Sequence, residues 1–135
     1  MRIRRLSFNL SLVFLCACLA ACGSGQPLHV SQIQLGRSLN ADHTVSKFTT
    51  TFMPDETVYL SVHTAGAGSG TISVRWTYAG RVIDEPKKDV SYRIDAATEF
   101  RLQSPAGFPP GDYSAEVFLN GQSAGTRPFS VQKQR

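Results

Sequence analysis

The sequence predicts an all-β domain, an antiparallel sandwich of about seven strands, behind an N-terminal signal segment. Apolar and polar residues alternate in the second half of the chain, which is the period of a half-buried strand. Turn residues interrupt that alternation about every ten residues, as they do in sandwiches. The mature chain has no convincing helical periodicity. An up-and-down barrel is the alternative, although its eight strands would be hard to fit.

The first 21 residues have the three parts of a secretory signal peptide. Arg2, Arg4 and Arg5 precede an apolar run from Leu6 to Ala21 that ends in small residues. This run is shorter than the ~20 residues that a permanent membrane-spanning helix needs. We therefore expect residues 1–21 to be removed.

The end of this segment, Leu19-Ala20-Ala21-Cys22, resembles the lipobox of bacterial lipoproteins. The resemblance implies cleavage after Ala21, a thioether between Cys22 and diacylglycerol, and acylation of the new amino terminus. Several acyl chains anchor a protein stably, whereas one is marginal. Gly23 is not the aspartate that signals inner-membrane retention in enterobacteria-like lipoproteins, so the resemblance implies an outer-membrane protein facing the periplasm.

Cysteine and charge counts narrow the classes of function. Loss of residues 1–21 leaves Cys22 as the single cysteine, so the mature chain has neither a disulfide nor a cysteine metal cage. The net charge of +4 includes three arginines of the leader, and the remaining 11 basic residues face 10 acidic ones. This balance argues against nucleic acid as a partner, because phosphate binding needs clustered basic side chains.

Residues 22–27 are expected to form the lipidated cysteine and a flexible tether, and residues 28–135 the domain. Leu28 to Leu39 and Val45 to Phe52 are weak strand candidates. The strong candidates are Thr57 to His63, Thr71 to Tyr78, the run around Phe100 and Leu102, Tyr113 to Leu119, and the return through Phe129 and Val131.

The connections between strands are also predicted. Asn120-Gly121 is typical of a type I′ hairpin turn, and Pro128 marks an edge or a bulge. Residues 65–70 are expected to be a flexible connection, and residues 105–112 a stiff one. Asp84-Glu85 is assigned to turn or edge positions and Lys87-Lys88 to a solvated loop.

Two motifs resemble the immunoglobulin-like sandwich. Trp76 lies in the middle of a strand, and Gly111 and Tyr113 fit the tyrosine corner, in which a tyrosine hydroxyl bonds to upstream backbone. Ala115 stands where the strand-F cysteine would be. The resemblance implies an immunoglobulin-like domain without the inter-sheet disulfide, with Trp76 packed on Ala115. The chain is also similar to small bacterial lipoproteins of unassigned role.

Side chains that could carry chemistry do not form a recognisable site. The glycines at 66, 68 and 70 lack the phosphate-binding spacing, and no two histidines have the i, i+2 spacing of zinc ligands on a strand. We therefore expect no catalytic, cofactor or metal site. The expected function is a non-catalytic binding or assembly module with an envelope protein partner and a lipid anchor in the membrane.

Two other functions stay open. Thr126-Arg127-Pro128-Phe129 faintly resembles the Arg-Pro-aromatic loop of chagasin-like inhibitors of cysteine proteases, which implies an envelope protease inhibitor as the alternative. An enzyme with an unrecognised site ranks third.

One surface is predicted as the interaction face. If Tyr113, Ala115 and Val117 point inward, Phe118 points outward, because side chains alternate along a strand. In an immunoglobulin-like strand order Arg75 joins Phe118 on that face. An arginine beside an aromatic ring is typical of interface centres. Pairing of Arg75 with Glu116 across the strands is the competing structural interpretation.

Overall fold

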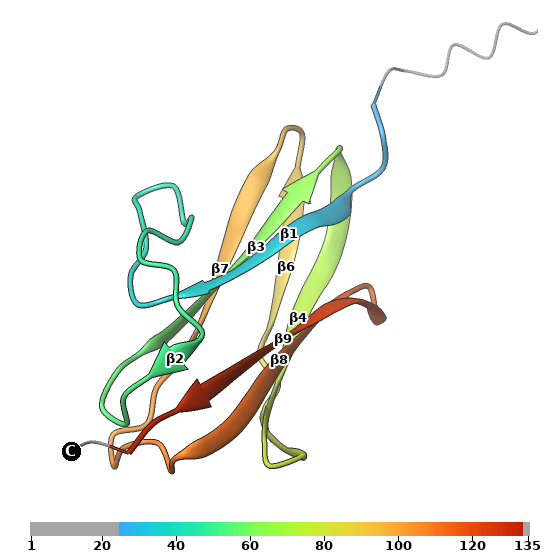
Figure 1. Ribbon diagram of the computed structural model, residues 1–135. Helices are drawn as coiled ribbons and strands as arrows, with labels where there is room; N and C mark the ends of the chain where they lie inside the picture. Colours follow the sequence, from blue (N-terminus) through green and yellow to red (C-terminus); the bar gives the residue numbers. More distant parts are fainter. Residues whose placement is uncertain (1–24, 134–135) are drawn as a thin grey trace, which may run out of the picture.

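The computed structural model describes residues 25–133, which contain nine strands and no helix. The strands form a sandwich of two sheets (Figure 1). The bounds are β1 His29–Gly36, β2 Thr51–Phe52, β3 Val58–Ala65, β4 Gly68–Tyr78, β5 Arg81–Asp84, β6 Lys87–Tyr92, β7 Ala96–Leu102, β8 Gly111–Leu119 and β9 Gln122–Val131. The signal segment and Cys22 lie outside the described residues.

The two sheets differ in size. The small sheet has the order β1-β3-β7, and the large sheet has the order β2-β9-β8-β4-β5, with β6 also paired to β4. Neighbouring strands run antiparallel except β2, which pairs parallel to the end of β9 and makes the large sheet mixed. The predicted all-β sandwich is thus confirmed.

Alternation places the core between the sheets. Most of the alternate side chains of the strong strand candidates are buried, including Val58, Leu60 and Val62 of β3 and Ile72, Val74 and Trp76 of β4. Tyr78 and Leu119, at the ends of β4 and β8, are partly buried. Phe52, Phe100, Phe108 and Phe129 fill the remaining interior. Burial of apolar surface drives this assembly, at about 25 cal/mol per Å².

The strand count exceeds the expected seven because the edge beyond β4 is occupied twice. β5 pairs with Trp76 to Tyr78, and β6 pairs with Gly68 to Ser73. The two strands form one broken partner of β4, interrupted at Glu85-Pro86, where the Pro86 carbonyl accepts the Val74 N–H at 3.0 Å.

Two predictions about connections were wrong, and one about a strand was right only in part. Lys87-Lys88 lies in β6 rather than in a loop, and this mostly exposed strand lacks the apolar alternation that reveals a strand. Gly68 to Gly70 begin β4, so the connection after β3 is only residues 66–67. Between Val45 and Phe52 only Thr51–Phe52 is a strand, and residues 37–50 otherwise form a long loop with isolated bridges.

Other turn predictions were confirmed. Asn120 and Gly121 both have positive φ, 52° and 79°, as a type I′ turn requires. Pro128 lies where β9 pairs with β8 alone, at an edge that needs no proline N–H.

The two ends of the sandwich differ in their connections. At the end where the N-terminal chain leaves, the short turns 66–67 and 93–95 join the two sheets, whereas the β8–β9 turn at 120–121 lies partway down the large sheet, level with Thr71 (Figure 1). The opposite end, called here the far end, carries the loops 53–57 and 103–110. Within residues 25–133 no helix is long and apolar enough to cross a membrane.

Candidate binding face

The outer side of β4 and β8 is the face that the sequence predicts for binding. β8 lies between β4 and β9, and Arg75 is the direct register partner of Glu116. Trp76, Ala115 and Val117 point into the core, so Arg75, Glu116 and Phe118 point outward. Phe118 is half-buried and the Arg75 side chain is 44% exposed. The predicted placement of these side chains on one face is confirmed.

The Arg75 side chain contacts Glu85, Glu116 and Phe118. These four residues together are called here the Arg75 cluster. The Arg75 Nε donates to Glu85 Oε1 at 2.6 Å, and Nη1 lies 3.9 Å from Glu116 Oε1. Its Cζ lies 4.9 Å from the centre of the Phe118 ring, within cation–π range. The hydrogen bond with Glu85 raises the pKa of the Arg75 guanidinium above its ordinary value.

Glu85 is the member of this cluster that sequence reasoning missed. It lies at the break between β5 and β6, ten positions from Arg75. The predicted competitor, Glu116, is present but farther from the guanidinium. The sequence assigned Asp84-Glu85 to turn or edge positions, and in the structure Glu85 lies at the edge beside β4, on the same face as Arg75.

Hydroxyl groups and a shallow hollow surround the cluster. Thr77 and Ser114 hydrogen-bond to each other across β4 and β8, and Ser123 donates to Glu116 at 2.8 Å. A hollow of about 180 Å³ lies beside Arg75, lined by Ser73, Val74, Glu85, Lys87, Phe118 and Gly121. The face therefore offers an aromatic edge, charges of both signs and hydroxyl groups in a fixed arrangement.

The outer side of the small sheet also carries an arginine beside an aromatic ring and a glutamate, but this side is partly covered by a loop. Arg101 lies 5.4 Å from the centre of the Tyr59 ring and 3.3 Å from Glu99. Beside this pair the loop 37–50 packs on the sheet, where the His43 carbonyl accepts the Ser61 hydroxyl at 2.7 Å. A Cβ at Gly36 would lie 2.2 Å from the Lys47 carbonyl, so the loop approaches the strand closely.

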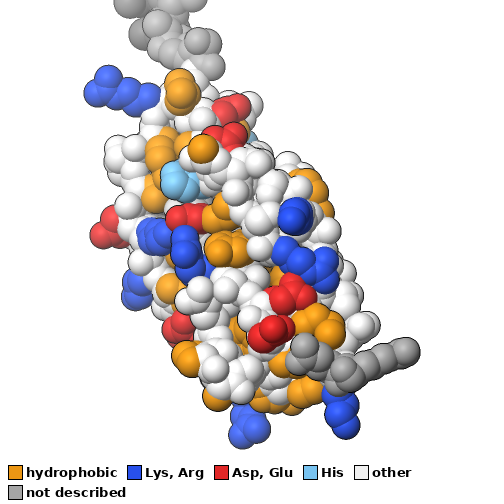
Figure 2. Space-filling model, turned by 90° about the vertical axis from the view of Figure 1, so that its left-hand side faces the viewer, with side chains coloured by type: hydrophobic (Ala, Val, Ile, Leu, Met, Phe, Trp, Pro, Cys, Tyr) orange, Lys and Arg blue, Asp and Glu red, His pale blue; other side chains and the backbone are white. Residues whose placement is uncertain are grey.

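Figure 2 shows the side of the molecule that lies at the left of Figure 1, where this loop lies. Basic and acidic side chains are interspersed over it, and hydrophobic side chains occur in small groups. Such mixed charge does not form the continuous basic surface that phosphate binding requires.

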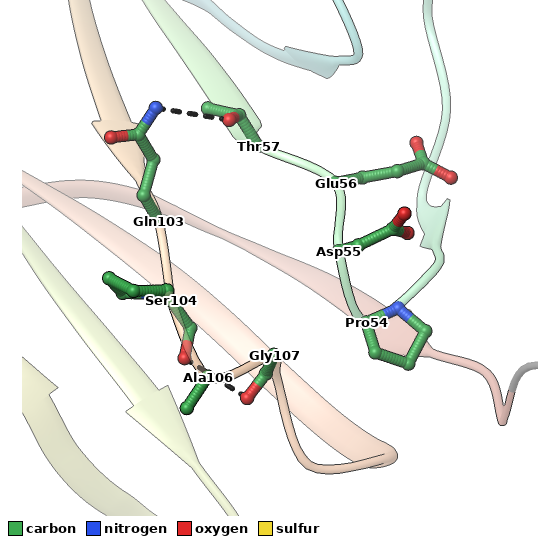
Figure 3. Close-up of a pocket in the computed structure, with 9 residues that line it drawn as sticks. Pro54, Asp55, Glu56, Thr57, Gln103, Ser104, Ala106 and Gly107 are labelled. Atoms are coloured by element: carbon green, nitrogen blue, oxygen red, sulfur yellow. Dashed lines mark hydrogen bonds between the residues drawn. The ribbon is translucent and has the colours of Figure 1, made fainter.

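A second hollow, of about 500 Å³, lies at the far end between residues 54–57 and 103–107 (Figure 3). Gln103 donates to Thr57 across it at 3.1 Å, while Asp55 and Glu56 point away from the facing segment. Glu56 is engaged by the Arg37 side chain at 2.5 Å and the Met53 N–H at 3.1 Å. The polar groups here close loops and do not converge on one point.

The remaining residues singled out in the sequence have structural partners. His63 contacts Gln34 Oε1 at 3.0 Å, His43 lies 3.7 Å from Glu99, and the His29 ring contacts the Pro27 carbonyl. In residues 25–133 no three His, Cys, Asp or Glu side chains gather as metal ligands.

The segment that resembles an inhibitor loop lies in a strand. Thr126 to Phe129 belong to β9, and the Phe129 ring is buried and stacked on Tyr113 at 5.3 Å between centroids. Phe129 is therefore unavailable for insertion into a protease cleft.

The immunoglobulin-like features are present in detail. Trp76 and Ala115 are register partners and fully buried, and the Trp76 ring meets Phe129 edge to face at 6.0 Å. Tyr113 donates its hydroxyl to the Pro109 carbonyl at 2.6 Å, which forms the tyrosine corner. Burial, with Tyr78 as a neighbour, raises the pKa of the Tyr113 phenol above its ordinary value.

Neither a protein-family model nor a curated protein sequence matches this chain. Its fold is similar to that of an immunoglobulin-like protein from Pseudomonas aeruginosa, with a TM-score of 0.54, 13% identity, and coverage of 82% of this chain and 100% of that one. A β-glucosidase from Listeria innocua matches at TM-score 0.51 and 13% identity, over 82% of this chain and 16% of the enzyme.

The alkylpurine DNA glycosylase AlkC from Pseudomonas fluorescens matches at TM-score 0.50 and 10% identity, over 80% of this chain and 31% of the enzyme. The chain thus spans a small part of both enzymes. Identities this low carry the fold and no activity. The described residues form an immunoglobulin-like β-sandwich that lacks the inter-sheet disulfide.

Proposed function

We propose that this chain is a lipid-anchored lipoprotein of the bacterial envelope that acts as a non-catalytic binding or assembly module. Its anchor is Cys22, its membrane is the outer membrane, and its domain faces the periplasm. The observation that carries the binding function is the Arg75 cluster on the outer side of β4 and β8. The lipobox and the residue that follows it, Gly23, support the anchor and its location.

The cluster suits recognition of an envelope protein for a physical reason. Glu85 and Glu116 hold the Arg75 guanidinium, and Phe118 lies beneath it, so little side-chain freedom is lost on binding. Arginine and aromatic side chains are enriched among the residues that dominate binding energy. The proposal therefore predicts that Arg75 and Phe118 matter for binding and little for folding.

The binding test is chemical crosslinking in the native envelope, followed by mass spectrometry of the anchored protein. Phe118→Ser and Arg75→Glu should each reduce recovery of the crosslinked partner at least several-fold. Arg101→Glu is the matched control, because Arg101 also lies beside an aromatic ring and a glutamate, on the opposite face. Equal recovery from all three variants would contradict the proposed face.

The anchor has a separate test. Cys22→Ser should abolish acylation and leave an unprocessed precursor, since a hydroxyl is a poor substitute for the thiol nucleophile. Globomycin should cause accumulation of the precursor of the unaltered protein. Mature protein without acyl mass would contradict the anchor. Gly23→Asp should shift the protein toward inner-membrane fractions on a density gradient.

The non-catalytic character is tested with the purified mature chain. A broad hydrolase screen should show no turnover above a buffer control, and titration against papain-like and serine proteases should show no inhibition. Activity that disappears on substitution of a single polar residue would favour an enzyme instead.

A further inference from the structure

The end of the sandwich where the N-terminal chain leaves has a defined surface. Gln26 and Pro27, expected to belong to a flexible tether, are bound to the turn after β3. The Gln26 carbonyl accepts the Ala67 N–H at 3.0 Å, the Ala67 carbonyl accepts the Leu28 N–H at 3.0 Å, and Pro27 forms a bridge with Ala67. The path of the chain is therefore set from Gln26 onward.

The turn between β6 and β7 lies at the same place. Tyr92 pairs with Gly68, and Ala96 pairs with Thr64, so residues 93–95 flank the turn 66–67 that holds Gln26. Figure 1 shows both turns at the end where the chain leaves. The start of the domain and residues 93–95 therefore lie at the same end of the sandwich.

This turn presents a large apolar side chain to solvent. Ile94 is 78% exposed, more than any other large hydrophobic residue that the structure describes as exposed. Arg93 and Asp95 flank it with opposite charges, and both are exposed. The charges of Arg93 and Asp95 cancel, so this turn has no net charge. A contact between this turn and another surface therefore depends on Ile94 and needs no charged partner.

We propose that this end of the sandwich lies directly on a phospholipid surface, with Ile94 inserted among the lipid headgroups. The inference rests on the proposed anchor at Cys22. Three residues lie between Cys22 and Gln26, so four Cα–Cα steps span at most ~14 Å in extended chain. Attachment this short keeps the end at a high effective concentration near the lipid, on the order of mM, which favours even a weak contact such as that of one apolar side chain.

A second exposed isoleucine serves as the reference position far from the proposed lipid contact. Ile83 of β5 is 46% exposed and lies level with Trp76 and Thr77, near the other end of β4. Trp76 is eight residue steps along β4 from Gly68, roughly 26 Å at about 3.3 Å per residue. An end-on domain therefore holds Ile94 at the lipid and Ile83 far from it.

The experiment uses the mature chain from Cys22, coupled through the Cys22 thiol to a maleimide phospholipid in zwitterionic nanodiscs. Chemical coupling supplies the anchor, so failure of this orientation is distinguishable from failure of biological lipidation. Methyl NMR of the isoleucine δ1 groups is recorded with and without a phospholipid that carries a headgroup nitroxide. Ile94 should lose at least half of its intensity, and Ile83 should keep nearly all of its intensity.

Two matched variants complete the test. Ile94→Ser should reduce the nitroxide attenuation of the Leu28 methyl groups, which lie at the same end, whereas Ile83→Ser should leave it unchanged. Equal attenuation of Ile83 and Ile94 would overturn the proposal, because it would mean a freely tumbling domain. Stronger attenuation of Ile83 would overturn it in favour of a domain lying on its side.

Discussion

β4 and β8 each have an inner and an outer side, and the two sides differ in what holds them together. Inside, Trp76, Tyr113 and Ala115 are buried among aromatic rings in a single packed arrangement. Outside, Arg75 and Phe118 meet partners that solvent also reaches. Neighbouring residues of one strand thus differ in role. The inner side chains stabilise the fold, and the outer side chains are accessible to a partner.

Trp76→Ala should produce the largest effect, because Trp76 is the largest fully buried side chain. Truncating a buried tryptophan costs about 3–5 kcal/mol, a large part of the stability of a small domain. Urea unfolding followed by circular dichroism measures the loss. Trp76→Phe is the control and should cost less, since no partner for the buried indole N–H lies in the described part of the chain.

The emission of Trp76 provides an independent check on the inner side. Fluorescence from the folded protein should be characteristic of a buried indole and should resist quenching by iodide. Emission at the wavelength of exposed tryptophan in folded protein would contradict the assignment of Trp76 to the core.

Tyr113→Phe should have an intermediate effect, about 0.5–1.5 kcal/mol, because it removes the hydrogen bond to Pro109 and keeps the buried ring. The variant should also change the pH dependence of stability. Since the folded-state pKa of Tyr113 is raised above the unfolded value of about 10, the unfolded chain loses this proton first. Stability therefore falls as pH rises above 10, and Tyr113→Phe should fall less steeply.

Phe118→Ser sharpens the comparison from the outer side. The ring is half-buried and does not belong to the core, so we expect a loss of about 0.5 kcal/mol or less. Differential scanning calorimetry measures the change in Tm. Collapse of the fold would mean that Phe118 belongs to the interior and that the outer side has been misassigned.

Arg75→Gln should have the smallest effect on stability. Its guanidinium is solvent-exposed, and exposed ion pairs contribute little because water and salt screen them. Tm should stay nearly unchanged, and any small difference from the unaltered protein should shrink in 1 M salt. A large loss that persists in high salt would show that Arg75 has a structural role.

The sequence was most informative where apolar and polar residues alternate along a strand. Val58, Leu60 and Val62 alternate with polar residues, so their burial could be read directly from the pattern. β5 and β6 could not be found in this way. Val82 and Ile83 are adjacent and both exposed, and β6 begins with two lysines, so neither strand has the alternating pattern of a half-buried strand. These edge strands are held by backbone hydrogen bonds to β4, which do not require buried apolar side chains.

The candidate face shows the same division. Local alternation sufficed to place Phe118 and Arg75 outward. The closest partner of Arg75 was hidden, since contact with Glu85 depends on how the chain turns after β4 and breaks before β6. Long-range partners follow from register and topology, which side-chain periodicity does not encode.

By itself the sequence determined the inward side of each strong strand, the core position of Trp76 and the tyrosine corner. These features are carried by residues close together in the chain, whose geometry is local. Only the tertiary structure decided that β5 and β6 share the edge of β4 and that Ile94 lies beside the turn that holds Gln26. Backbone pairing brought these segments together, and pairing partners are chosen by the whole fold.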